Sequence, residues 1–245
     1  MWNRKEIKGF AKSGVKRNYW KTVLTAFLMA AFTGGLSLAV RNNLRNSVSC
    51  GKTQTEVDPL MNVFSPEVYM AMGIAVAGML ACAVLFRVLV TNPFAVGAYK
   101  YSLNAVRETG HLSDLGSGFK IGYKRKVKTM FLMDLYTALW SVLFIIPGIV
   151  KAYEYRMIPY LLADNPEMGK TEAFKTSKSM MNGNKWNAFV LDLSFILWDI
   201  LGVMTLGLVE VFWVGPYKLL AGAALYDALK EHETHGNAQT VAVTK

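Results

Sequence analysis

The chain has 245 residues, of which 53% are hydrophobic and 18% are charged, and its formal net charge is +10. The hydrophobic fraction exceeds that of an average soluble domain, and it is concentrated in runs that approach the length of a bilayer span. This composition excludes an ordinary soluble globular protein, and we predict an all-α, polytopic membrane helical bundle.

The positive charge is distributed unevenly along the chain. Segments 1–21 and 98–129 each hold seven Lys or Arg residues, whereas segment 41–67 holds three basic and three acidic residues. This asymmetry follows the positive-inside rule and places the N-terminus in the cytoplasm. We therefore expect the basic residues to meet the anionic headgroups of the lipid bilayer, at about 1 kcal/mol each, and we expect no nucleic acid partner.

The predicted elements begin with a basic amphipathic helix at residues 3–18, which would lie at the membrane interface. Six spans follow, at about 22–40, 67–91, 129–146, 149–163, 187–206 and 208–227. They form three hairpins within a single membrane domain, residues 1–230. Residues 231–245 are predicted to be a polar, disordered cytoplasmic tail, so both termini lie inside.

Three local features refine these boundaries. Asn92-Pro93 is predicted to break or kink the second span, because proline lacks an N–H donor and clashes with the preceding turn. Pro147-Gly148 is predicted to form the external turn of the second hairpin. Residues 171–181 are predicted to form a further amphipathic segment before the fifth span.

A ten-residue pattern, F-x-x-D-L-x-x-x-L-W, occurs at 131–140 and again at 189–198. It places Asp134 and Asp192 inside two ascending spans, where a carboxylate costs a few kcal/mol unless it is neutral, paired or exposed to a wet cavity. The pattern indicates an internal repeat of related hairpins, although the first hairpin lacks the aspartate. Each descending limb also carries a proline before an aromatic residue, at Pro93, Pro159 and Pro216.

Two interpretations of Asp134 and Asp192 stay open. They could bind a ligand or carry a proton in a cytoplasm-facing cavity. Alternatively, they could fix the helix register by binding Lys218, Tyr160, Tyr217 or an interfacial helix, and the sequence favours this structural role.

The fourth span carries three further charges. Lys151 and Glu154 are three residues apart and can form a structural ion pair on one helix face. Arg156 would then need a partner from another helix, with Asp199 and Glu210 as candidates. Arg156 and Lys218 could instead form an anion-binding cavity, although an internal ion-pair network is favoured. Lys151 could also snorkel to the interface.

The sequence supports no catalytic, cofactor or metal site. Its two cysteines, Cys50 and Cys82, fall in the predicted outer loop and in a span, and neither forms part of a metal-binding pattern. With three histidines and no Ser/His/Asp set, hydrolase catalysis is unsupported, and we predict that the protein is not an enzyme.

The segment Gly183-Asn184-Lys185-Trp186, together with the amphipathic residues 177–181 and Ile146-Pro147-Gly148 through Tyr153, resembles the bacterial domain-of-unknown-function family 975. The resemblance extends over about residues 4–230. It implies a six-helix domain in the plasma membrane, with a layout similar to the membrane region attached to some glycerophosphodiester phosphodiesterases. It brings no established activity.

Two functions are compatible with these features. The first is a non-enzymatic module that binds or moves a lipid or small amphiphile at a cavity near Asp134, Asp192, Arg156 and Lys218. The alternative is a membrane scaffold or regulatory subunit that docks a protein partner through its interfacial helices.

Overall fold

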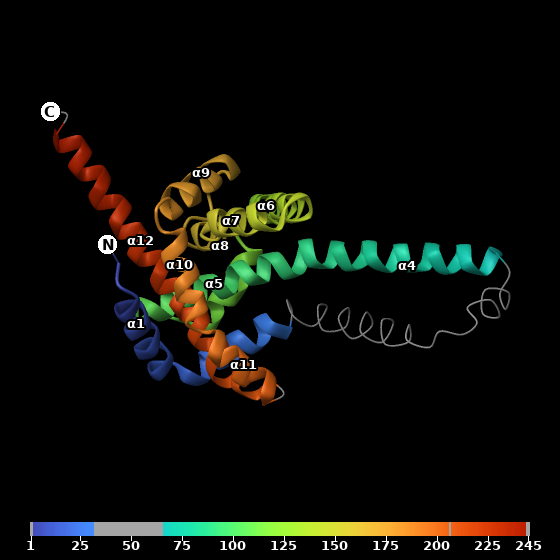
Figure 1. Ribbon diagram of the computed structural model, residues 1–245, viewed down its shortest axis with the longest axis horizontal. Coiled ribbons are helices and arrows are strands. Elements are labelled where there is room, and N and C mark those ends of the chain that lie inside the picture. The colour runs from blue at the N-terminus through green and yellow to red at the C-terminus, as the bar shows by residue number, and fades with distance from the viewer. Residues whose placement is uncertain (1, 32–65, 206, 244–245) are drawn as a thin grey trace.

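Figure 1 shows the computed structural model of the protein, which describes residues 2–31, 66–205 and 207–243. All regular secondary structure in these ranges is helical, so the all-α prediction is confirmed. The elements in chain order are α1 (Arg4–Arg17), a helix through 19–31, α4 (Pro66–Phe86), η2 (Arg87–Thr91), α5 (Asn92–Val106), η3 (Leu112–Phe119), α6 (Tyr123–Leu143), α7 (Ile145–Tyr155), α8 (Ile158–Asp164), α9 (Lys170–Met181), α10 (Lys185–Leu193), α11 (Ile196–Met204), η4 (Glu210–Val214) and α12 (Gly215–Val243).

Helix α1 forms where the sequence predicts the first amphipathic segment. The Asn3 side chain accepts a hydrogen bond from the Lys5 N–H, which satisfies one of the free donors of the first turn. Ile7, Ala11 and Val15 recur every four residues and are buried, while most of the lysines are exposed. This apolar stripe packs α1 against α5 and α12.

The buried core lies where α1, α5, α8, α9 and α12 meet (Figure 1). Its largest fully buried side chains include Tyr101 of α5, Leu162 of α8 and Tyr226 of α12. Close approach of backbones contributes to this packing, since a Cβ on Gly118 would lie 1.8 Å from the Pro93 carbonyl oxygen. The core therefore joins elements from both ends of the chain.

Outside this core the helices expose apolar side chains. Helix α4 extends away from the other labelled helices (Figure 1), and residues Glu67–Val106 form a continuous 40-residue helix with a hydropathy of 2.3 in its most apolar window, none of which is buried. Among the described residues it is the one helix long and apolar enough to cross a membrane. Val142, Ile145 and Ile146, where α6 meets α7, are also 76% to 87% exposed.

Of the break or kink predicted at Asn92-Pro93, the break is wrong, because the helix continues through these residues. One π-helical turn, η2, precedes the proline, and the Asn92 N–H bonds to the Arg87 carbonyl five residues back. Pro93 cannot donate to the carbonyl of Leu89, four residues earlier. The Tyr123 hydroxyl donates to that carbonyl instead, at 2.8 Å.

The same arrangement occurs near the end of the chain. The π-helical turn η4 precedes Pro216, and the carbonyl of Phe212, again four residues earlier, accepts a hydrogen bond of 3.1 Å from the Tyr19 hydroxyl. A side chain from another part of the chain thus supplies a donor that the proline lacks, and the helix continues past the proline.

Three other boundaries differ from the predictions. The turn of the second hairpin lies at Phe144, whose backbone is extended, and Pro147-Gly148 lies inside the first turns of α7. The predicted span 187–206 is interrupted between α10 and α11. The predicted disordered tail instead continues α12 as a helix to Val243. The external loop predicted at 41–66 lies almost wholly outside the described residues, as does the end of the first span.

Candidate ligand-binding site

A cavity of about 700 Å³, here called cavity A, lies among α4, η2, α5, α6, α7 and α8. Most of its wall is apolar, with side chains such as Val84, Phe131 and Pro159. Its charged lining residues are Arg87, Asp134 and Arg156. Cavity A therefore offers a few charged groups within apolar walls, as small-molecule sites commonly do.

Asp134 is weakly paired in cavity A. Its Oδ2 accepts a hydrogen bond of 3.2 Å from the Asn92 side-chain amide and lies 3.9 Å from Arg87 Nε. The Arg87 side chain is 61% exposed, so it has freedom to move. The sequence did not single out Asn92 or Arg87 as partners of Asp134, since nothing in the pattern relates residues 42 positions apart.

A second, smaller cavity of about 270 Å³, cavity B, shares Arg156 with cavity A. Arg156 forms a two-pronged ion pair with Asp192, in which Nη2 lies 2.8 Å from Oδ1 and Nη1 lies 2.5 Å from Oδ2. The Tyr153 hydroxyl donates a third hydrogen bond to Asp192, at 2.8 Å. This geometry fixes both the guanidinium and the carboxylate.

Lys218 also lines cavity B. It donates to Asp199 and lies 3.7 Å from a carboxylate oxygen of Glu210. The floor of the cavity depends on Gly222, because a Cβ there would lie 2.2 Å from the Tyr160 hydroxyl oxygen. Cavity B is thus lined by charges that are already paired.

The four predicted site residues therefore line two cavities that meet at Arg156: Asp134 in cavity A, and Asp192 and Lys218 in cavity B. Their expected partners are wrong in detail. Arg156 pairs with Asp192 rather than with Asp199 or Glu210, and those two acids lie beside Lys218. The sequence shows which residues carry charges of opposite sign, but only the packing of the helices determines which of them form ion pairs.

Lys151 forms an ion pair with Glu154, with its Nζ 2.7 Å from Oε2. Lys185 Nζ lies 2.5 Å from the other carboxylate oxygen of Glu154. The Glu154 side chain is 8% exposed, while Lys151 Nζ also lies 5.7 Å from the centre of the Trp140 ring. These contacts join α7 to α6 and α10. They lie away from the linings of both cavities.

The family model described as "Protein of unknown function (DUF975)" matches residues 127–233. This part of the chain, here called the DUF975 segment, is similar to that family. The resemblance seen in the sequence is therefore confirmed for the DUF975 segment. No curated protein and no solved structure matches the chain.

The two cavities differ in how much of their lining the DUF975 segment supplies. All residues that line cavity B lie within it. Cavity A takes Asp134 and Arg156 from the DUF975 segment, but Val84, Arg87, Val88 and Tyr99 come from the preceding part of the chain. The helix Glu67–Val106 is therefore needed to complete cavity A.

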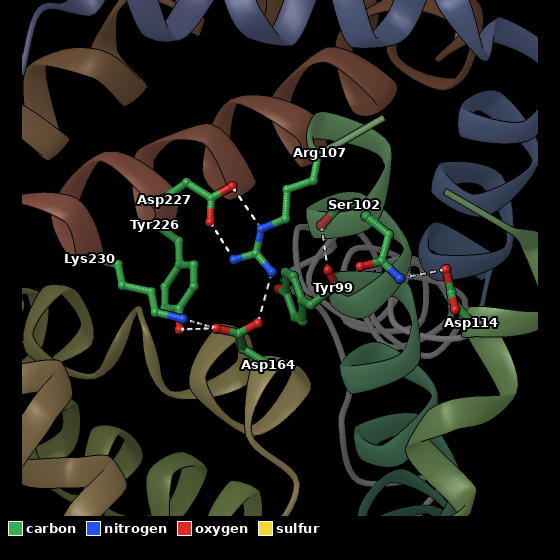
Figure 2. Close-up of polar contacts among 9 residues, drawn as sticks. Tyr99, Ser102, Arg107, Asp114, Asp164, Tyr226, Asp227 and Lys230 are labelled. Atoms are coloured by element: carbon green, nitrogen blue, oxygen red, sulfur yellow. Dashed lines mark hydrogen bonds and ion pairs between the residues drawn. The ribbon is translucent and has the colours of Figure 1, made fainter. Parts of the chain in front are cut away.

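A charged cluster that sequence reasoning missed lies outside both cavities (Figure 2). Arg107, at the end of α5, binds Asp164 at 2.8 Å and Asp227 at 2.5 Å. Asp164 also accepts hydrogen bonds from Tyr226 at 3.1 Å and from Lys230 at 2.5 Å. We call this set, Arg107, Asp164, Tyr226, Asp227 and Lys230, the Arg107 clamp.

The Arg107 clamp changes the acidity of its members. Burial by itself would raise the pKa of Asp164, but the hydrogen bonds and positive charges of Arg107 and Lys230 outweigh it and lower the pKa to about 2. Burial disfavours the charged form of Arg107, yet its bonds to Asp227 and Asp164 raise its pKa. The clamp thus holds α5, α8 and α12 together through ionised groups.

Proposed function

We propose that the protein is a non-enzymatic membrane module that binds or moves a lipid or small amphiphile at cavities A and B. The observation that carries this proposal is cavity A, where an apolar wall surrounds Arg87, Asp134 and Arg156. An amphiphile needs both kinds of surface, since its tail requires apolar walls and its headgroup requires charges or hydrogen-bonding groups.

The proposal includes a bilayer crossed by six spans. Helix α4 supports it most directly, because its apolar side chains are exposed over its whole length. The exposed apolar residues where α6 meets α7, and Leu197 and Met204 of α11, support two further hairpins. Exposed apolar surface of this extent is costly in water and is expected where lipid covers it.

Three contacts support the related hairpins. Asp134 meets Asn92 and Asp192 meets Arg156, so each aspartate of an ascending span contacts the descending limb of the hairpin before it. In the first hairpin, which lacks the aspartate, Ala26 takes the corresponding position, because it follows Trp20 by six residues as Asp192 follows Trp186. A Cβ on Gly215, in the last descending limb, would lie 3.7 Å from the Ala26 Cβ. Three hairpins arranged in a closed ring explain all three contacts.

The proposed setting is a bacterial plasma membrane, with both termini in the cytoplasm. The basic residues of segments 1–21 and 98–129 support this orientation through the positive-inside rule. In that orientation α1 and its lysines lie against the inner leaflet, where anionic headgroups are the expected partners.

The experiment is mass spectrometry of the molecules that co-purify with the detergent-solubilised protein. We expect a lipid or small amphiphile bound to the wild type, and loss of that ligand when Asp134 and Asp192 are both replaced by Asn. Glu172→Gln is the matched control, because it removes a carboxylate from an exposed position on α9. Normal ligand binding by the double variant would refute the site.

Single variants are needed to interpret the double one. Asp192→Asn leaves Arg156 without its anionic partner, so that variant disturbs the protein as well as the site. Asp134→Asn removes a weakly paired carboxylate and keeps its size, so it tests cavity A with the smaller change.

The second candidate is a membrane scaffold or regulatory subunit that binds a protein partner through its interfacial helices. Phe10, on the lysine-rich helix α1, favours it because this large apolar side chain is 62% exposed. Affinity purification from native membranes distinguishes the two functions. A stoichiometric protein partner without a bound lipid would favour the scaffold.

A further inference from the structure

Asp134 is less tightly paired than two other carboxylates of the proposed spans, Asp192 and Glu154. Asp192 receives three hydrogen bonds from cationic or hydroxyl groups, and Glu154 receives two from lysines. Within the described part of the chain, Asp134 receives one hydrogen bond, from a neutral amide. An ionised carboxylate can accept about four, so Asp134 retains most of its capacity.

The cations near Asp134 do not complete its pairing. Arg156 lines the same cavity, but both of its terminal nitrogens are engaged with Asp192. Arg87 lies at the outer limit of an ion pair, 3.9 Å away, and most of its side chain is exposed. Cavity A thus places an accepting carboxylate and a movable guanidinium close together, beside apolar walls.

We propose that cavity A recognises an amphiphile whose headgroup carries a primary ammonium next to a phosphate. The ammonium would donate N–H bonds to Asp134, and the phosphate would bind Arg87, which has the freedom to turn toward it. This inference rests on the proposed function and names the class of ligand at that site. It assigns cavity A rather than cavity B, because the charges of cavity B are already paired.

The primary ammonium is the distinguishing feature of this ligand. A quaternary ammonium has no N–H donor, so it cannot form the hydrogen bonds that Asp134 accepts. A headgroup with a phosphate but no amine, such as phosphoglycerol, can donate O–H bonds to Asp134, but it brings a second anion near the carboxylate with no positive charge to offset it. Phosphatidylethanolamine fits the site, whereas phosphatidylcholine and phosphatidylglycerol both lack a primary ammonium.

The test is native mass spectrometry of the full-length protein in detergent, titrated with these three lipids carrying identical acyl chains. We expect phosphatidylethanolamine to bind about tenfold more tightly than phosphatidylcholine, the effect of one charged hydrogen bond. Asp134→Asn should remove most of this preference. Asp134→Glu, which keeps the charge, should retain part of the preference for phosphatidylethanolamine. This control would show that the loss in Asp134→Asn is not caused by unfolding.

The outcomes separate this inference from the proposed function. Equal binding of phosphatidylethanolamine and phosphatidylcholine, or an unchanged preference in Asp134→Asn, would overturn the inference and leave lipid binding intact. Tightest binding of phosphatidylglycerol would also overturn it. If none of the three lipids binds, the inference fails, and the absence of any co-purifying lipid or amphiphile would refute the proposed function as well. Displacement of bound lipid by soluble O-phosphoethanolamine would support the same headgroup chemistry and assign a water-soluble source.

Discussion

The two aspartates of the repeated pattern occupy different environments, although their sequence contexts match. Asp192 is held by Arg156 and Tyr153, whereas Asp134 has a neutral amide and a distant Arg87. The difference arises from the descending limb that each one meets, because the first limb has Asn92 where the second presents Arg156. We therefore expect the two carboxylates to have different roles, Asp192 in structure and Asp134 in binding.

Asp192→Asn should destabilise the protein more than Asp134→Asn. Removing the negative charge leaves Arg156 without its counterion and weakens a charged hydrogen-bond set worth about 2 kcal/mol. Thermal unfolding in detergent, followed by tryptophan fluorescence, should show a drop in Tm of several degrees for Asp192→Asn and a smaller one for Asp134→Asn. Equal drops would contradict this division of roles.

The Arg107 clamp, whose Asp164 lies outside the proposed spans that cross the membrane, should make the stability of the fold sensitive to acid. The pKa of Asp164 is about 2 in the folded protein and near 3.9 in an unfolded chain. A lowered pKa stabilises the fold above the unfolded value, and this contribution, about 2 kcal/mol, is lost as the pH falls from about 4 through about 2. Asp164→Asn should lower Tm at neutral pH and reduce the further loss between those pH values.

At the scale of elements, two tyrosines from distant segments make the proline-containing helices continuous. Each donates a hydroxyl to the carbonyl four residues before a proline, Tyr123 to Leu89 and Tyr19 to Phe212. Each hydroxyl supplies a hydrogen bond that the proline cannot donate, which allows the helix to continue past a proline that follows a π-helical turn. The sequence showed the prolines, but nothing near them in the chain indicated the donors.

Tyr123→Phe should cost about 1 kcal/mol of stability, the value of one hydrogen bond. Pro93→Ala restores a backbone N–H, which can bond to the Leu89 carbonyl in place of the hydroxyl. In the double variant the cost of Tyr123→Phe should therefore fall to about half or less. A double-mutant cycle from denaturant unfolding in detergent measures this coupling. If the two free-energy changes simply add, the backbone N–H at position 93 does not take over from the Tyr123 hydroxyl.

At the scale of the whole molecule, apolar and charged surfaces are segregated. The Arg107 clamp and the core join α5, α8 and α12 at one end, while α4 extends from the opposite side of the core (Figure 1). With basic residues on α1 and on segment 98–129, this segregation matches a protein whose basic end meets the cytoplasmic surface of a membrane.

Cysteine labelling of intact cells tests the orientation. Cys50 falls in the predicted external loop, and Ser113 is exposed in η3, which precedes the basic start of α6. A membrane-impermeant maleimide should label Cys50 from outside, and it should label a Ser113→Cys variant lacking Cys50 only after permeabilisation. Labelling of both sites in intact cells would contradict the proposed topology.

Much of the architecture follows from local pattern. Helical periodicity and hydrophobic length predict α1, α4 and α9 close to their observed places. An apolar stripe along one helix face and a long apolar run can both be read from the residues of the helix itself. The family resemblance and the candidate residues Asp134, Asp192, Arg156 and Lys218 could also be found in the sequence, since charges within apolar runs stand out.

Tertiary structure decided which of these charges meet. Ion pairs between helices depend on how helices far apart in the chain pack, and opposite charges in a sequence allow many combinations. The fold pairs Arg156 with Asp192, places Asp199 and Glu210 beside Lys218, and assembles the Arg107 clamp through bonds between residues up to 120 positions apart. It also leaves Asp134 with unused hydrogen-bonding capacity in an apolar cavity, and a ten-residue pattern cannot encode that difference, because the partners lie outside it.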